Sequence, residues 1–436
     1  MLKSIAGRIA LFMLIGVSVM ASSGCGGRDE TRKIVFVGNT ESGADYEVCQ
    51  EIWQGVSAYA AESGAEASIY TPDLSAAGSR IAMMNAIDEG ADVIVCVGDE
   101  MASAVYDLQQ RENQTEFVLI DDIPTNGSGS GKSRIRGNTF SVMCNRQEAG
   151  FLAGYAAVSE GYRKIGFLGG SAGEDDRMYG SGFIQGAEAA GKAMGYSDGE
   201  VEIRYRLTTS NAISPTLVSE IGNWFREGCE LISVCGSGPE FIGPESAAQF
   251  GGKVITADIN QLDTSDSIVA ASGINHINVV QLALKDLEKG ELKGGEKNFF
   301  GLSEGGVTLQ LKEGQFQSFT DAEQTALTDK ITSGEIEIKN ADVAENPERY
   351  EITVCSLIGV EDALAEAEAA ENGEEASGSS NTPDTANTPD SVGETGTEEV
   401  SGGSVTENII DSSSSTSDAA GEDDAAAGED DAAAGF

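Results

Sequence analysis

The chain has 436 residues, enough for two or three domains, and its 40% hydrophobic content supports a sizeable core. The formal net charge of −45 argues against a nucleic-acid binder, because such a protein needs a basic surface to neutralise phosphates. No Lys or Arg follows Arg349, so much of this charge belongs to the C-terminal segment and says little about the folded part.

The N-terminus has the pattern of an export signal. Lys3 and Arg8 give it a positive start, and Ile9–Met20 is almost wholly apolar but too short to span a bilayer comfortably. We therefore assign residues 1–24 to a signal peptide, which predicts an exported protein.

Gly24-Cys25 resembles the end of a lipobox, in which the cysteine is acylated and becomes the mature N-terminus. The usual motif has Leu three residues before the cysteine, where this chain has Ser22, so cleavage by an ordinary signal peptidase is the alternative. We predict lipidation of Cys25, because residues 25–32 would then form a flexible polar tether at the extracytoplasmic face of the cell membrane.

Strand-like runs and helix-period segments alternate twice along the chain. Short apolar runs predict strands over residues 33–37, 67–70, 92–97, 116–120, 164–168, 201–205, 230–234 and 253–257. Apolar residues at helical spacing predict helices over residues 46–63, 76–89, 101–112, 145–160, 182–194 and 217–227. This alternation predicts an α/β protein with two doubly wound parallel-sheet lobes, whose ligands bind where the strands end.

The C-terminal part has a different composition. Glu361–Ala370 is a short helix candidate within an extension over residues 346–371. Residues 372–436 consist mainly of Ser, Gly, Thr, Ala and acidic residues, too few of them apolar to offset the entropy of ordering, so we predict a disordered acidic tail.

Some motifs suggest phosphate binding, metal binding or catalysis, but their sequence context argues against each of these. Residues 127–133 resemble a phosphate-binding loop, but Asn126 stands where the first glycine should be and a β-like run follows. His276 is the single histidine, which argues against a zinc site and against a histidine-dependent hydrolase, and we expect it to pack near a cap or hinge. Cys96 and Cys235 lie in strand-like runs and are expected to be small buried hydrophobes. We predict neither a cofactor nor a metal, and no enzyme activity.

Short polar residues follow several predicted strands, among them Asp121 and Asp258, one in each half of the chain. Each carboxylate can accept two hydrogen bonds, which suits a hydroxyl-rich solute such as a sugar or a ribose. Turn capping is the competing explanation. If these side chains line a solvated rim, their replacement by Ala should affect folding little.

Two blocks of the sequence resemble the basic membrane protein (BMP) family of ABC-transporter substrate-binding lipoproteins, whose best-known members bind purine nucleosides. In the first block, 33–55, the matching residues are Asp45, Gln50, Trp53 and Gly55. In the second, 164–186, they are Gly169, Gly170, Arg177, Gly182, Phe183 and Gly186. Residues 300–307 and 330–336 are similar to the closing blocks of the family.

The resemblance implies a type I periplasmic-binding-protein fold that closes about a hinge on a small-molecule ligand. We place the three hinge crossovers near 134–141, 268–275 and 299–307. The implied N-terminal lobe covers 33–137 plus 275–298, and the C-terminal lobe covers 138–274 plus 299–345. The implied partners are a membrane permease and a cytoplasmic ATPase. A sensory or regulatory lipoprotein that is not coupled to transport is the alternative.

The resemblance also implies which residues contact the ligand. These positions are Asn39, Asp45, Val48, Cys49, Asp121, Asn211, Asp258 and Ile274. Val48 and Asn211 replace aromatic residues that stack on the base, and Ile274 replaces a lysine. The carboxylates at Asp121 and Asp258 are kept, so the ribose side of a nucleoside site is expected to survive while the base sandwich is lost.

Overall fold

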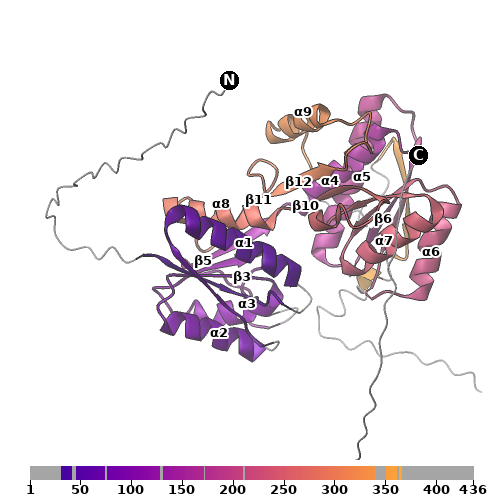
Figure 1. The fold of residues 1–436 in the computed structure, drawn as a ribbon. Coiled ribbons are helices and arrows are strands. Elements are labelled where there is room, and N and C mark those ends of the chain that lie inside the picture. The colour runs from indigo at the N-terminus through magenta and orange to yellow at the C-terminus, as the bar shows by residue number, and fades with distance from the viewer. Residues whose placement is uncertain are drawn as a thin grey trace, which may run out of the picture. The chain divides into compact units, whose positions relative to one another are not determined.

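The computed structural model describes residues 31–41, 46–73, 76–127, 131–170, 172–209, 212–339, 350–360 and 363–365 (Figure 1). Two sheets and their flanking helices lie within one compact unit of the chain. The α/β class and the parallel-sheet lobes are as predicted. The predicted signal peptide, Cys25, nearly all of the short helix candidate and the acidic tail lie outside the described residues.

The first sheet has six strands in the order β11-β5-β4-β3-β1-β2, and all its pairs are parallel. The strands are β1 (Lys33–Val37), β2 (Glu66–Tyr70), β3 (Val93–Val97), β4 (Glu116–Ile120), β5 (Thr139–Cys144) and β11 (Lys297–Phe300). Four helices cover it: α1 (Tyr46–Ser63), α2 (Ala76–Asp88), α3 (Asp99–Leu108) and α8 (His276–Lys289). We call this sheet with its four helices the N-lobe.

Each strand of the N-lobe sheet supplies side chains to both faces, because successive residues of a strand alternate. Ile34 and Phe36 of β1 face α1 and α8 in the larger core cluster of the protein. Val35 and Val37 face α2 and α3 in a second cluster. Figure 1 shows these helix pairs on opposite faces of the sheet, which explains why its central strands are apolar throughout.

The second sheet has seven strands in the order β12-β10-β9-β8-β6-β7-β13, of which only β12 runs antiparallel to its neighbour. The strands are β6 (Lys164–Gly169), β7 (Val201–Leu207), β8 (Leu231–Cys235), β9 (Lys253–Thr256), β10 (Ile268–Ile274), β12 (Val307–Leu311) and β13 (Thr353–Ile358). Its helices are α4 (Arg146–Glu160), α5 (Glu174–Met194), α6 (Pro215–Arg226), α7 (Ser237–Phe250), α9 (Asp321–Thr332) and the short η1 (Ile259–Gln261). We call this group the C-lobe.

Helices α4 and α5 pack with their backbones in close contact. A Cβ atom at Gly154 would overlap the carbonyl oxygen of Phe183, and one at Gly186 would overlap that of Phe151. Gly182 lies just as close to the α4 backbone. Glycines spaced by four residues on both helices therefore allow this packing, and two of them belong to the block that resembles the family.

Three connections join the lobes: β5 to α4, β10 to α8 and β11 to β12. The first lies at residues 144–146, beyond the 134–141 predicted, because β5 continues to pair with β4 as far as Val142. The other two lie at or next to the predicted positions. The backbone N–H of Asn145 donates to Phe300 and that of Asn275 donates to Gly306, at 3.0 and 2.9 Å, so the connections are bonded to one another.

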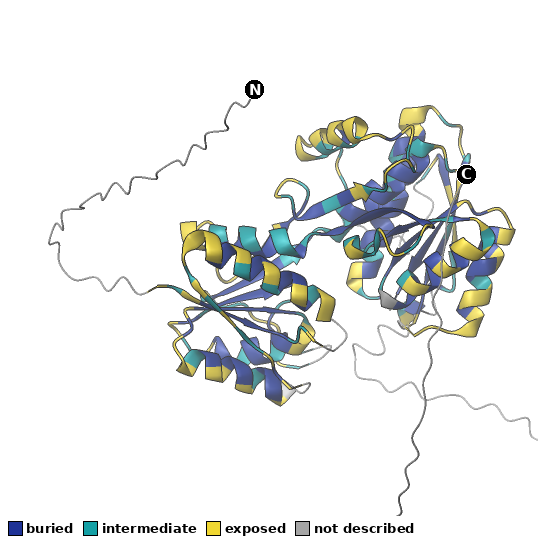
Figure 2. Cartoon of the chain, in the orientation of Figure 1, coloured by how far each residue is buried: buried dark blue, intermediate teal, exposed yellow. Residues whose placement is uncertain are grey.

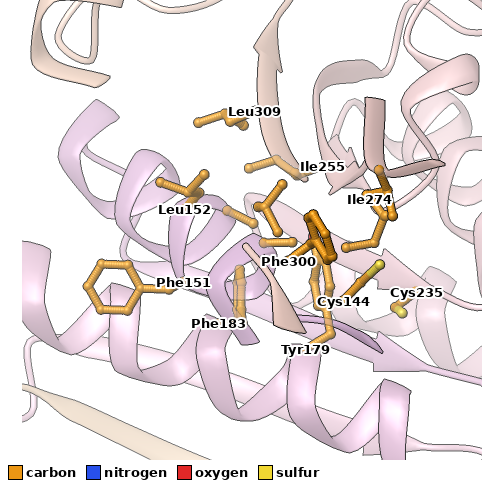
Figure 3. Packing of buried hydrophobic residues seen from close by; sticks show 14 of the residues in the cluster. Cys144, Phe151, Leu152, Tyr179, Phe183, Cys235, Ile255, Ile274, Phe300 and Leu309 are labelled. Carbon is orange, nitrogen blue, oxygen red and sulfur yellow. The ribbon is translucent and has the colours of Figure 1, made fainter. Parts of the chain in front are cut away.

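A continuous apolar core extends beneath these connections. Cys144 and Phe300 come from the N-lobe sheet, and they share one buried cluster with Ile255, Ile274 and Leu309 of the C-lobe sheet (Figure 3). Figure 2 shows the same pattern at larger scale, with buried strands and helices whose exposed residues face outward. The ends of the strands that lead from one lobe to the other are thus fixed by packing on both sides.

Strand β13 was not predicted, since the C-lobe was expected to end at residue 345. It pairs parallel with β7 at the edge of the sheet. The buried carboxylate of Glu188 accepts hydrogen bonds from the backbone N–H groups of Ile352 and Thr353, at 3.0 and 2.9 Å, just where β13 begins. The segment after residue 345 therefore completes the C-lobe.

No helix among the described residues has the length and hydrophobicity needed to cross a membrane.

Candidate functional site

The strands of both lobes end in acidic side chains. Asp121 and Asp122 follow β4, Asp175 and Asp176 lie in the first turn of α5 after β6, and Asp258 follows β9. The carboxyl ends of parallel strands are where doubly wound sheets bind ligands. The structure therefore places a candidate binding site at these ends.

Asp121 is the centre of an ion-pair network. Its backbone is left-handed, with φ of 58°, a conformation that Asp tolerates better than most residues. Its side chain is 12% exposed and accepts hydrogen bonds from Arg146 Nη2 at 2.8 Å and from His276 Nε2 at 3.2 Å. Burial by itself would raise the pKa of Asp121, but the charge of Arg146 and the hydrogen bond from His276 hold that pKa well below its usual range.

His276 is the first residue of α8 and joins Asp121 to a second carboxylate. Its Nδ1 lies 2.8 Å from Oε2 of Glu51, which projects from α1 and is itself buried. Burial lowers the pKa of His276, but hydrogen bonds to Asp121 and Glu51 and the charges of both carboxylates outweigh it and raise the pKa to about 9. His276 is thus an imidazolium at neutral pH.

Arg146 is the first residue of α4 and connects the network to the C-lobe. Its Nε lies 2.8 Å from Oδ2 of Asp175. On the other side, the Glu51 carboxylate accepts a hydrogen bond of 2.6 Å from the side-chain amide of Asn260 in η1. We define the hinge network as these six side chains: Glu51, Asp121, Arg146, Asp175, Asn260 and His276.

Two carboxyl groups near the hinge network, those of Asp122 and Glu240, belong to none of its ion pairs and have raised pKa values. Burial, then the charges of Asp99 and other acids, raises the pKa of Asp122 to about 6. Burial, then the charges of Asp258 and Asp176, raises the pKa of Glu240 in α7 to about 8. The carboxyl ends of the strands are therefore rich in oxygen atoms that can accept hydrogen bonds, while burial and mutual repulsion favour the neutral form of Glu240 at pH 7.

Asp258 serves a local structural purpose as well. Its carboxylate caps η1 by accepting a hydrogen bond of 2.9 Å from the backbone N–H of Asn260. Burial, opposed by this hydrogen bond, raises the pKa of Asp258. Turn capping and ligand binding are compatible at this position, because a carboxylate that caps a turn keeps further acceptor sites.

The remaining predicted ligand residues have different environments. Asn39 follows β1, and its side-chain oxygen accepts the backbone N–H of Glu41 at 3.0 Å. Val48 is half-buried, Cys49 is buried, and both pack in the larger core cluster. Ile274 is 5% exposed in the same core. Asp45 and Asn211 lie outside the described residues.

The sequence-based prediction missed Glu51, Arg146, Asp175 and Asn260. No local motif marks them, since they come together only in the tertiary structure. The expectation that Asp121 lines a solvated rim is wrong, because its side chain is nearly buried and pairs with two cations. Cys96 and Cys235 are buried, as expected. Among the described residues no cluster of His, Cys, Asp and Glu is arranged to hold a metal ion.

Solved structures share this fold. A solute-binding protein of an ABC transporter system from Aeropyrum pernix K1 is 19% identical, with a TM-score of 0.54, and the match covers 78% of this chain and 99% of that one. A similar solute-binding protein from Conexibacter woesei is 15% identical, with a TM-score of 0.52, and the match covers 71% of this chain and 99% of that one.

Curated relatives point to the same class of protein. The ABC transporter nucleoside-binding protein BmpA of Lactococcus lactis subsp. cremoris is 23% identical over 76% of this chain and 97% of its own length. Basic membrane protein D of Borreliella burgdorferi is 24% identical over 54% of this chain and 67% of its own length. Residues 35–342 match the family described as Bmp, ABC transporter substrate-binding protein PnrA-like. The chain belongs to this family of substrate-binding proteins, as its sequence blocks predicted.

Proposed function

We propose that this chain is the lipid-anchored binding protein of an ABC importer, and that it captures a hydroxyl-rich, nucleoside-like solute and delivers it to a permease. The observation that carries the proposal is the convergence of acidic side chains from both lobes at the carboxyl ends of their strands. The family supplies the class of function, which is solute binding rather than catalysis.

The acceptors at the strand ends favour a solute with several hydroxyl groups. Asp258 and Asp122 are only partly buried, and no described Lys, Arg or His forms an ion pair with either. Hydroxyl donors on a solute can hydrogen-bond to such carboxylates, and a hydrogen bond to a charged group contributes about 1.5–3 kcal/mol. A ribose presents neighbouring hydroxyls in this way.

In this chain the base of a nucleoside would contact fewer aromatic side chains than in a relative that has both stacking residues. Val48 stands where the family resemblance implies a stacking aromatic residue, and stacking on one aromatic face is worth roughly 1–3 kcal/mol. We therefore expect this chain to bind purine nucleosides more weakly than a relative with both faces. The Lactococcus lactis relative is named as a nucleoside-binding protein, which supports a nucleoside as the solute class.

Binding would be coupled to a hinge motion about the three connections between the lobes. A ligand shifts such an equilibrium only by the difference in its affinity for the two states, so contacts to both lobes are needed to favour closure. Asp122 in the N-lobe and Asp258 in the C-lobe provide them. The closed form would then dock on a permease, with a cytoplasmic ATPase supplying the energy for uptake.

A thermal-shift panel tests this proposal. The full chain would be melted with inosine, guanosine, uridine, ribose, galactose and arginine, each in large excess. A ligand at 100 times its dissociation constant stabilises the protein by about 2.7 kcal/mol, which is a readily measured shift. We expect inosine or guanosine to give the largest shift. A panel in which arginine alone raises the melting temperature would contradict a nucleoside-like solute.

A further inference from the structure

Two of the three connections between the lobes have the same design. Strand β5 is followed by Asn145 and then Arg146, and strand β10 is followed by Asn275 and then His276. In both cases Asn is the residue before a helix and the cation is the first residue of that helix. A positive charge at a helix N-terminus is unfavourable, so these cations need carboxylates to hold them there. Both of them bind Asp121.

Both ring nitrogens of His276 have to donate a hydrogen bond. Its two nitrogens lie 2.8 and 3.2 Å from carboxylate oxygens of Glu51 and Asp121, and an ionised carboxylate can only accept. A neutral imidazole has one N–H and would leave one carboxylate facing a nitrogen lone pair. The geometry therefore requires the imidazolium. Because the His276 side chain is 9% exposed, water cannot readily take the place of the missing donor.

The two carboxylates that contact His276 also contact residues of the C-lobe. Glu51 lies on α1 and Asp121 follows β4, both in the N-lobe. Beyond them, Asn260 and Asp175 belong to the C-lobe, at 2.6 Å from Glu51 and 2.8 Å from Arg146. The proton on His276 thus joins the two N-lobe carboxylates, Glu51 and Asp121, that Asn260 and Arg146 of the C-lobe contact.

We propose that His276 is the positioning residue of the binding site: its imidazolium bridges Glu51 and Asp121, fixes the carboxyl end of β4 against α1, and makes solute affinity fall when the proton is lost at high pH. The predicted change in solute affinity rests on the proposed function, whereas the bridge between Glu51 and Asp121 does not.

Other titratable groups face this bridge and define its surroundings. They include Asp122 after β4, Cys144 at the end of β5, Arg146 at the start of α4, Asp175 in α5, Asp258 before η1 and Glu47 on α1. Arg146 stays charged at any pH of interest, so it continues to neutralise Asp121 after His276 loses its proton. Glu51 pairs with no second cation among the described ion pairs. When His276 loses its proton, Glu51 is therefore the carboxylate whose charge is no longer neutralised.

The bridge is tested first without any solute. The chain has a single histidine, so labelling the full chain with ¹⁵N-histidine, and using no histidine tag, gives one imidazole to titrate by NMR. We expect a His276 pKa of about 9. Glu51→Gln should lower it, whereas Glu62→Gln, an exposed residue at the other end of α1, should not. A His276 pKa below 7 in the unaltered chain would overturn the proposal.

The positioning role is tested by solute affinity against pH, with inosine as the probe. Calorimetric titration from pH 6.5 to 9.5 should show affinity falling by up to about fourfold, because a group with a pKa of about 9 keeps its proton in only about a quarter of the molecules at pH 9.5. His276→Gln should bind weakly at low pH and lose this part of the pH dependence. An identical pH profile in the two proteins would overturn the positioning role. If inosine binds at no pH, the proposed nucleoside function fails, and the imidazole titration alone decides whether the bridge exists.

Discussion

At the scale of single residues, the chain uses charge in two ways at the carboxyl ends of its strands. Asp121 and Glu51 are neutralised by Arg146 and His276, whereas Asp122 and Glu240 face other acids and have raised pKa values. The first set connects elements to one another, and we propose that Asp122 of the second set contacts the solute. The sequence predicted Asp121 but assigned it to the second set, because the partners that neutralise it are far away in the chain.

The charge of His276 predicts a loss of stability at alkaline pH. Its pKa is raised from 6.5 to about 9 in the folded protein, so its contribution is complete below pH 6.5 and disappears as the pH rises through 9. A shift of this size corresponds to about 3 kcal/mol of unfolding free energy. Urea unfolding at pH 6 and pH 9.5 measures it.

The control for this prediction is His276→Gln, because Glu240 titrates in the same range, with a pKa of about 8. The loss of stability between the two pH values should be smaller in the variant by about the amount that His276 contributes. Equal losses in the two proteins would show that other groups account for the alkaline instability.

Adjacent aspartates give a matched pair of substitutions. Asn tolerates the left-handed backbone of residue 121, so Asp121→Asn removes the charge without adding strain. We expect it to cost about 3 kcal/mol of unfolding free energy, because it leaves buried Arg146 and His276 without their shared carboxylate. Asp122→Asn should leave stability at pH 7 unchanged or raise it, since the fold already disfavours the charged form of Asp122. Denaturant unfolding at pH 7 compares them, and equal effects would contradict the separate roles of these residues.

At the scale of elements, strands β1–β4 and β6–β9 and helices α1–α6 were predicted because their apolar residues recur at strand or helix spacing, whereas β5, β10–β13 and α7–α9 were not predicted. Helix α7 was not predicted, since Pro239, Pro244 and two glycines break its pattern. The prediction also began α5 eight residues late, at Gly182, because glycines hid the helical spacing. The acidic first turn, Glu174 to Asp176, was the usable signal.

The contact between α4 and α5 predicts a large effect of a single methyl group. Ala favours an isolated helix over Gly by about 1 kcal/mol, but a Cβ at residue 154 would overlap the backbone of α5. We expect Gly154→Ala to lower the unfolding free energy by roughly 2–3 kcal/mol, the upper range for overpacking. Gly137→Ala is the control, because a Cβ there meets open space, and it should change stability by less than about 0.5 kcal/mol. A stabilising Gly154→Ala would show that the helices separate easily.

At the scale of the whole molecule, the two-lobed plan followed from the repeated alternation of strands and helices, but the assignment of β5 and β13 did not. β5 precedes a helix of the C-lobe and yet pairs with β4 of the N-lobe. β13 is a short edge strand next to an acidic extension. On its other side β5 pairs with β11, and β13 pairs with β7, so both complete their sheets with strands distant in sequence, which local patterns do not reveal. The hinge network depends on the same long-range assembly.

The proposed membrane anchor belongs to this scale as well. Cys25→Ala removes the acylation site. Once its signal peptide has been cleaved, a protein without a lipid group should not be retained at the membrane. We expect the variant to move from the membrane fraction to the soluble fraction in a fractionated culture, while the unaltered chain stays with the membrane. A variant that remains as membrane-bound as the unaltered chain would contradict lipidation at Cys25.

The central claim is that carboxylates at the strand ends bind a nucleoside-like solute, and calorimetric titration of inosine into Asp258→Asn tests it most directly. Asn can still cap η1, so this variant separates solute binding from turn capping. We predict that inosine binds the unaltered chain and that Asp258→Asn weakens binding by about 1.5–3 kcal/mol, whereas Asp263→Asn, an exposed neighbour, leaves it unchanged. Equal affinity of Asp258→Asn and the unaltered chain would contradict the claim.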